Sequence, residues 1–149
     1  MRYEHIAGVR VRATFADEFG VRYRYRLEVT REGVLRPRRT VCAIMQNPSC
    51  ADRVIADKSA QFLEKIVFER NLPEFRRVDR LLIVNQFARI QTTGFVEIET
   101  DIGLRNDRVI KQALRTSQIA LIAWGASNRF RHRQQTILGF LADSPCRMR

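Results

Sequence analysis

Three short apolar runs, each followed by a segment of helical periodicity, constrain the fold of this 149-residue chain more than any other feature. The runs are "TVCAIMQ" at 40–46, "RLLIVNQF" at 80–87 and "QIALIAWG" at 118–125. Continuous apolar runs of this length are typical of strands buried on both faces. Such strands alternating with helices predict a mostly parallel sheet covered by helices on both sides.

Helix signals follow each of these runs. Asp57 is a candidate N-cap for a helix over 58–70, in which apolar residues recur with helical spacing. Asn106 is a candidate cap for a second helix over 107–117, and 130–143 forms a third. The order strand, helix, strand, helix, strand, helix is therefore expected.

Two segments of period-two alternation precede the first run. In 8–15 and 21–29, apolar residues alternate with arginines, and a short glycine-containing link joins the segments. This pattern predicts an antiparallel hairpin that extends the sheet at one edge. Tyr23 and Tyr25 would lie on the face opposite the arginines. The arginine face is either solvated or bound to an anionic partner, because like charges on neighbouring strands repel.

These elements predict a single α/β domain over 1–149, a three-layer αβα fold with a mostly parallel sheet and an N-terminal antiparallel hairpin. Apolar residues make up 45% of the chain and charged residues 29%, as in ordinary globular proteins. The sequence has no apolar run long enough to span a membrane and no signal-like N-terminus, so no membrane partner is expected. The cysteines lack paired spacing, which together with the missing signal indicates the cytoplasm. The sequence gives no reason to expect a metal or another cofactor, and it leaves the oligomeric state open.

Positive charge is concentrated at both ends of the chain. The net charge is +11 overall, with +5 in residues 1–40, zero in 41–100 and +6 in 101–149. This distribution is compatible with a surface that binds a polyanion, and equally with arginines that only aid solubility. The candidate nucleic-acid-binding residues, all expected to face solvent, are Arg10, Arg12, Arg22, Arg24, Arg26, Arg131 and Arg133.

Small polar residues end the three apolar runs. In open α/β sheets, ligands bind at the carboxyl ends of the strands, so a pocket is expected there. The amides of Asn47 and Asn85 suit reading the edge of a base or an amide, and Pro48 would keep its loop rigid. Trp124 offers a stacking surface, and Gly125 allows close backbone approach. The alternatives are that Asn47 only hydrogen-bonds its own loop and that Trp124 belongs to the core.

Acidic residues follow the first run closely. Asp52 and Asp57 are the candidates for activating a water molecule, although Asp57 as a plain N-cap is the simpler interpretation. Nucleophilic catalysis by Ser49 or Cys50 is disfavoured, since no histidine is near them in the sequence.

The motifs "IMQNPSCAD", "ADKSAQFLEKI", "LLIVNQFARIQTT" and "IALIAWG" resemble the uncharacterised domain-of-unknown-function family 1643 over about residues 21–142. The resemblance implies an α/β fold but no established activity. Gln46, Cys50 and Ile90 depart from the family's usual Leu, Thr and Arg. A fainter likeness links the pattern to uracil-DNA glycosylase-like folds. The resemblance implies site roles for Asn47, Pro48, Ser49, Asp52, Asp57, Ser59, Asn85, Thr92, Trp124 and Gly125.

Three hypotheses follow for the function. The first is a pocket that binds a nucleobase or nucleotide, with hydrolysis of an N-glycosidic bond left open as an additional activity. The second is a non-catalytic nucleic-acid-binding module held by arginines on phosphates. The third is an accessory or interaction protein in which the strand-end motif is purely structural.

Overall fold

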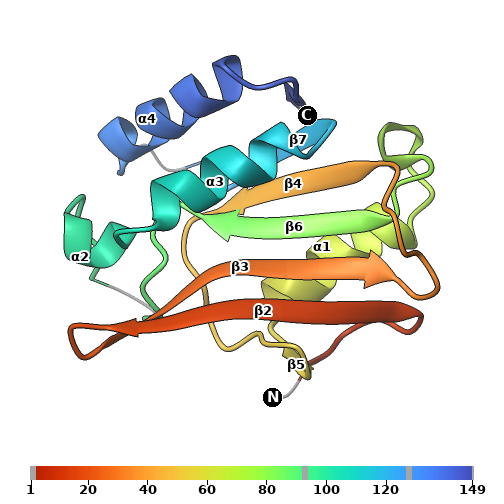
Figure 1. Ribbon diagram of the computed structural model, residues 1–149, viewed down its shortest axis with the longest axis horizontal. Coiled ribbons are helices and arrows are strands. Elements are labelled where there is room, and N and C mark those ends of the chain that lie inside the picture. The colour runs from red at the N-terminus through yellow and green to blue at the C-terminus, as the bar shows by residue number, and fades with distance from the viewer. Residues whose placement is uncertain (1–2, 92–93, 127–128, 149) are drawn as a thin grey trace.

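A six-stranded mixed sheet forms the centre of the protein, as the computed structural model shows for residues 3–91, 94–126 and 129–148 (Figure 1). The strand order is β2-β3-β6-β4-β7-β8. Strands β6, β4, β7 and β8 are mutually parallel, and the β2–β3 hairpin joins β6 in antiparallel orientation. The strand bounds are β2 Val9–Glu18, β3 Val21–Arg31, β4 Thr40–Met45, β6 Arg80–Asn85, β7 Ile119–Ala123 and β8 Arg147–Met148.

Helices cover both faces of this sheet. Helix α1 lies behind it in Figure 1, and α3 and α4 lie in front. A short antiparallel pair, β1 with β5, lies beside the α1 layer. The predicted three-layer α/β fold with an added hairpin is therefore confirmed. The remaining bounds are α1 Lys58–Phe68, α2 Glu99–Ile102, α3 Asn106–Arg115, α4 Arg131–Ala142, β1 Tyr3–Glu4, β5 Ile55–Ala56 and a 3₁₀ turn Pro73–Phe75.

Alternate residues of the central strands fill two separate cores. Val41 and Ala43 pack in the cluster that includes α1, whereas Cys42 and Ile44 pack in the cluster beneath α3 and α4. All four side chains are fully buried. This division explains why the strands appear in the sequence as unbroken apolar runs: both faces are covered.

A β-bulge in the hairpin overturns one expectation about the arginines. Thr14 pairs with Arg26 and Phe15 with Arg24, so Tyr25 is the additional residue on β3. Beyond a bulge the alternation of side chains is reversed. Arg24 is consequently buried, with 1% of its surface exposed, and it does not share the solvent face of Arg26.

Tyr25 occupies the place that regular alternation would have given to an arginine. Its ring stacks on Tyr23 at 5.6 Å between centroids, and its hydroxyl donates to Glu18 at 2.9 Å. Gly103 lies against the same ring, where an added Cβ would be 2.9 Å from the Tyr25 Cε1 atom. The bulge thus places two tyrosines between β3 and the α2–α3 segment.

The start of α3 also differs from expectation. Asn106 is the first residue of the helix and makes no capping bond; Arg105 precedes it at the cap position. The Asn106 side chain donates instead to the carbonyl oxygens of Asn85 and Gln86, at 2.9 and 3.2 Å. It therefore links α3 to the end of β6.

Arg133 on α4 was expected to face solvent, and this is wrong. Its side chain is buried, with its Nη1 2.7 Å from Asp107 Oδ1 and its Nε donating to the Gln86 carbonyl at 2.7 Å. The neighbouring Arg131 is exposed as expected. Burial of a charge is tolerated here because the guanidinium is paired and hydrogen-bonded.

Candidate functional site

The loop after β4 is tied to the segment after β6. Asn47 Nδ2 donates to the carbonyl oxygens of Pro48, at 3.3 Å, and of Gln91, at 3.1 Å. The Gln46 carbonyl accepts from the Phe87 N–H at 3.0 Å. Pro48, within the same loop, is buried. The two strand ends therefore hold each other in place, and Asn47 serves its own loop as well as the neighbouring segment.

A polar cleft of about 310 Å³ opens between this loop, the start of α1 and the end of β7. Four residues singled out from the sequence meet there: Asn47, Ser49, Asp57 and Trp124. The resemblance added Ser59, which also lines the cleft. The complete lining is Met45, Gln46, Asn47, Ser49, Asp57, Ser59, Ala123 and Trp124.

Other residues expected at this site lie elsewhere. Asp52 and Asn85 do not line the cleft, and Gly125 lies at the adjoining groove described below. The φ angle of Gly125 is +84°, a conformation that L side chains rarely adopt. Thr92 is outside the described residues.

The carboxylates of both candidate acids accept hydrogen bonds from backbone N–H groups. Asp57 is the N-cap of α1, and its Oδ1 accepts from the Ala60 N–H at 2.7 Å. Asp52 Oδ1 accepts from the N–H groups of Ile55 and Val54, at 2.7 and 2.8 Å. These bonds, led by that of Ile55, lower the pKa of the Asp52 carboxyl against the opposing effect of partial burial.

Asn85 lies beneath the cleft instead of within it. It follows Ile83 on the face of β6 that packs toward α1, and it pairs in register with Met45. Its side chain is fully buried, and neither amide atom has a hydrogen-bond partner among the described residues. The amide atoms of Gln86 are in the same condition. Buried amides without partners are costly, so water or a bound group is expected to satisfy them.

Arg24 was expected among the solvent-facing arginines that could bind nucleic acid, and this is wrong: it lies buried under the loop after β4. It donates from Nη1 to the Ala51 carbonyl at 2.9 Å and so supports the loop from below, while its Nε has no partner among the described residues. Burial lowers the pKa of Arg24, and the charges of Asp57 and Asp52 oppose this effect. No sequence signal could have predicted its buried position, because that position depends on the bulge.

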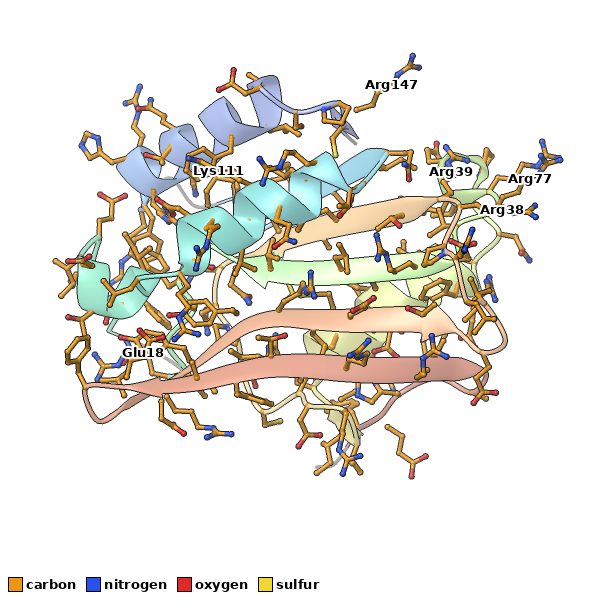
Figure 2. All side chains as sticks on the ribbon, in the orientation of Figure 1. Glu18, Arg38, Arg39, Arg77, Lys111 and Arg147 are labelled. Atoms are coloured by element: carbon orange, nitrogen blue, oxygen red, sulfur yellow. The ribbon has the colours of Figure 1, made fainter. Side chains whose placement is uncertain are left out.

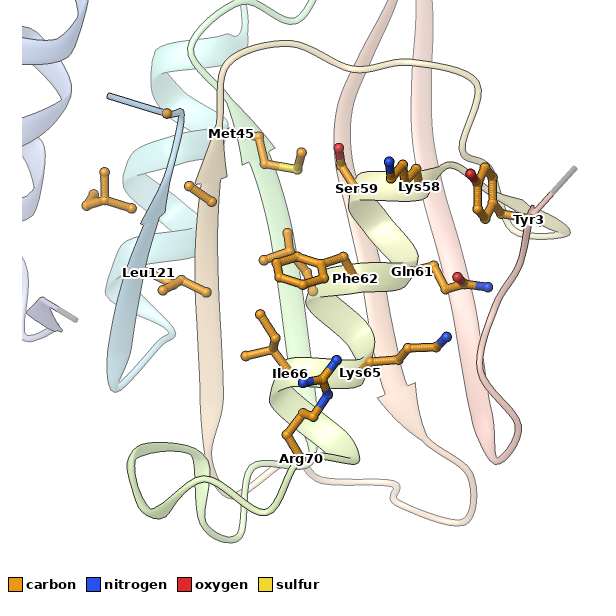
Figure 3. A pocket seen from close by; sticks show the side chains of 14 residues that line it. Tyr3, Met45, Lys58, Ser59, Gln61, Phe62, Lys65, Ile66, Arg70 and Leu121 are labelled. Atoms are coloured by element: carbon orange, nitrogen blue, oxygen red, sulfur yellow. The ribbon is translucent and has the colours of Figure 1, made fainter. Parts of the chain in front are cut away.

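An apolar groove of about 800 Å³ continues from the cleft along α1 (Figure 3). Phe62 and Ile66 of α1 form one wall, and Leu121 and Ala123 of β7 form the other. Phe62 is one of the apolar residues that recur with helical spacing in 58–70, yet 55% of its surface is exposed. The groove exists because α1 covers β4 and β6 but leaves this face of β7 open.

Three cations stand along the groove. Lys58, Lys65 and Arg70 come from α1 or the residues just after it, and Figure 3 shows them one after another along the helix. The groove and the cleft share Met45, Ser59 and Ala123 in their linings. The two hollows therefore form one continuous surface, polar at the strand ends and apolar with a cationic rim farther along.

The family described as "Protein of unknown function (DUF1643)" matches this chain over residues 24–149. The chain belongs to this family. No curated protein and no solved structure matches the chain. The resemblance seen in the motifs is thus confirmed for DUF1643, whereas these comparisons give no support for a likeness to uracil-DNA glycosylase-like folds.

The DUF1643 match covers nearly all of this site. It begins at Arg24 and includes α1, β4, β6 and β7, with every residue that lines the cleft. Of the residues that line the groove, Tyr3 alone lies before the match. Strand β2 and the hairpin arginines Arg10, Arg12 and Arg22 also lie before it.

Metal-binding and membrane features were sought in the same part of the chain. Within residues 3–91, 94–126 and 129–148, no group of three His, Cys, Asp or Glu side chains is arranged to hold a metal ion. No helix in these ranges is long and apolar enough to cross a membrane. The three cysteines are unpaired.

Proposed function

We propose that the cleft and the groove together bind a nucleotide. The observation that carries this proposal is their continuity through Met45, Ser59 and Ala123, which joins amide groups and an indole to a row of cations. A nucleotide combines a flat base with hydrogen-bonding edges and a negatively charged phosphate. Each half of the surface complements one half of such a ligand.

The base is assigned to the cleft. Gln46 and Asn47 line the cleft with their amides, and because Gln46 Nε2 donates to Asn47 Oδ1 at 3.4 Å, the Gln46 amide oxygen is the group offered to the edge of a base. Trp124 borders the cleft, with its half-buried side chain packed against the core beneath α3 and α4. The volume of about 310 Å³ lies at the lower end of the range of small-molecule sites.

The phosphate is assigned to the start of α1. Lys58 and Ser59 occupy the first turn of the helix, where N–H groups and the helix dipole favour an anion. Lys65 lies on the same helix two turns farther along the groove. A longer phosphate chain would extend toward it.

Calorimetric titration with free bases, nucleosides and nucleotides tests this proposal. We expect nucleotides to bind more tightly than the matching nucleosides, and Lys58→Gln to remove that difference. Lys111→Gln, on the far layer of the protein, is the matched control and should leave it unchanged. Binding that is absent for all three ligand classes, or a nucleotide preference that survives Lys58→Gln, contradicts the proposal.

Hydrolysis of an N-glycosidic bond is the further step that we propose for this site. Asp57 is the carboxylate that lines the cleft; its Oδ1 caps α1, and its Oδ2 has no hydrogen-bond partner among the described residues. In this role it orients the attacking water. Asp57→Asn keeps a good N-cap, so it separates catalysis from folding.

The assay measures release of free base from nucleosides and nucleotides. Loss of base release in Asp57→Asn, at an unchanged melting temperature, supports hydrolysis. Wild-type protein that binds nucleotides but releases no base shows that the site binds without this chemistry.

A further inference from the structure

We propose that the amino ends of the sheet strands form a second binding surface, which holds the phosphate backbone of a nucleic acid duplex. This surface lies at the opposite end of the strands from the cleft. Figure 2 shows Arg38, Arg39, Arg77 and Arg147 together at that end of the molecule. The basic end is defined by Arg38, Arg39, Arg76, Arg77, Arg115 and Arg147.

Backbone and side-chain contacts hold the connectors of the basic end side by side. Arg39 Nη1 donates to the Arg76 carbonyl at 2.5 Å, which ties the β3–β4 connector to the α1–β6 connector. The Gln118 N–H donates to the Thr40 carbonyl, and the Arg147 N–H donates to the Gln118 carbonyl, both at 3.0 Å. These hydrogen bonds hold the arginines of four separate segments in fixed positions relative to one another.

The charge of the basic end is not neutralised by the protein. None of its six arginines forms an ion pair with a carboxylate in the described part of the chain. Asp79 lies in the same region, but it accepts from the backbone N–H groups of Arg38 and Arg39. On the hairpin, by contrast, Arg22 pairs with Asp17 at 2.9 Å.

The dimensions and shape of the basic end match a polymer. It extends from β6 to β8, which lie three strand spacings, or about 14 Å, apart. This width corresponds to about four base steps along the axis of a duplex. Arg39, Arg115 and Arg147 line one hollow of about 380 Å³, and Arg76 and Arg77 line another of about 500 Å³. Guanidinium groups bind phosphate oxygens in pairs, so such a row suits repeated phosphates.

A duplex fits this surface better than a single strand. Single-strand binding relies on aromatic rings that stack with bases. The aromatic rings near the second hollow, Phe68 and Phe75, are buried, with 6% and 8% exposed. Leu35 and Leu72 are exposed in the same connectors, so an anionic membrane is the competing partner. The hollows favour a backbone that can enter them over a flat bilayer.

One residue of the basic end adopts a costly backbone conformation. Arg77 has φ of +62°, in the left-handed region where glycine or asparagine is usual. An exposed arginine at such a position gains nothing from burial that would offset the strain. A contact between the Arg77 side chain and a ligand accounts for this backbone conformation.

Fluorescence anisotropy with a short labelled duplex of mixed sequence tests the proposal, with the salt concentration varied from about 50 to 200 mM. Six phosphate contacts predict a loss of affinity of roughly a thousand-fold over this range. The variant Arg38→Gln/Arg77→Gln/Arg147→Gln should flatten the logarithmic salt slope by about 2.7. The control Arg53→Gln/Arg108→Gln/Lys111→Gln removes the same charge from exposed cations outside the basic end and should keep the wild-type slope.

Three results would overturn the proposal: equal losses in both triple variants, tighter binding to anionic phospholipid vesicles than to the duplex, or no duplex binding by the wild-type protein. If the first triple variant does not fold, each single substitution should still lower the slope by about 0.9. Nucleotide titration of the same variants reports on the cleft, so the two proposals fail independently.

Discussion

The imidazole of His5 and the carboxylate of Glu64 form a 2.7 Å ion pair that fastens the N-terminal segment to the buried face of α1. The other ring nitrogen of His5 lies 2.6 Å from the Asp52 carbonyl oxygen. Both partners are acceptors, so the arrangement favours the imidazolium form of His5, in which both ring nitrogens can donate. The N-terminal segment, α1 and the loop after β4 are thereby joined at one charged side chain.

The first prediction concerns the pH dependence of stability. Burial alone would lower the pKa of His5, but its hydrogen bonds to Glu64 and Asp52, together with the nearby negative charges, raise it above the ordinary value. A raised pKa means that the contribution to stability is complete below about pH 6.5 and is lost as the pH rises through the higher folded value. His5→Gln should therefore reduce the free energy of unfolding more at acidic pH than at alkaline pH. Denaturant unfolding at several pH values measures this, and an equal loss at every pH would contradict it.

The second prediction concerns the cap of α1. Asp57→Ala removes the acceptor for the Ala60 N–H and should lower the free energy of unfolding by about 1 kcal/mol. Asp57→Asn should cost less, because asparagine also caps helices well. Thermal unfolding of the two variants provides the comparison. Identical losses would show that the charge of Asp57, not the capping bond, stabilises the helix.

The third prediction concerns Gly103. Its φ is +93°, and an added Cβ would lie 2.9 Å from the ring of Tyr25. Gly103→Ala combines backbone strain with overpacking and should lower the free energy of unfolding by roughly 2–4 kcal/mol. Gly94→Ala is the control: its φ is also positive, at +82°, but its Cβ would meet no atom within 4 Å. A similar loss in both variants would mean that the ring contact contributes little.

The fourth prediction concerns Arg77. Arg77→Gly relieves the left-handed strain and should raise the free energy of unfolding by about 1 kcal/mol. The same change should weaken duplex binding, since it removes one cation from the basic end. Thermal unfolding and anisotropy on one preparation measure both effects. A variant that gains stability and keeps full duplex affinity would separate the strain from the binding.

Periodicity predicts the central elements well because their packing is local and repetitive. The run at 40–46 becomes β4, Thr40–Met45, and the segment after Asp57 becomes α1 with that residue as its cap. The strand-end rule also brings Asn47 and Trp124 to one cleft, although they are far apart in sequence. These features follow from burial on both faces and from chain direction.

The features that the sequence does not predict depend on neighbours. The alternation on β3 is regular, so the reversal at Tyr25 arises only from its pairing with β2. In the sequence, Arg133 has the position of a solvent-facing residue on its helix. Its burial arises from the pairing with Asp107 on α3, which the sequence of α4 alone does not predict. Phe62 has the spacing of a core residue, yet within the described part of the chain the adjacent face of β7 is left open as one wall of the groove. The groove therefore could not be foreseen from single segments.

Strand β2 is the outermost strand of the sheet, and its ten residues leave a long row of backbone groups unpaired within the sheet. Such a row is a template for edge-to-edge association of two copies. Arg10 and Arg12 place positive charge at alternate positions along it. The bulge of β3 opposite Phe15 increases the local twist of the hairpin. A second copy that approached this edge would meet the same charges on the same curvature. We therefore expect the hairpin arginines to oppose aggregation, whether or not they bind a ligand.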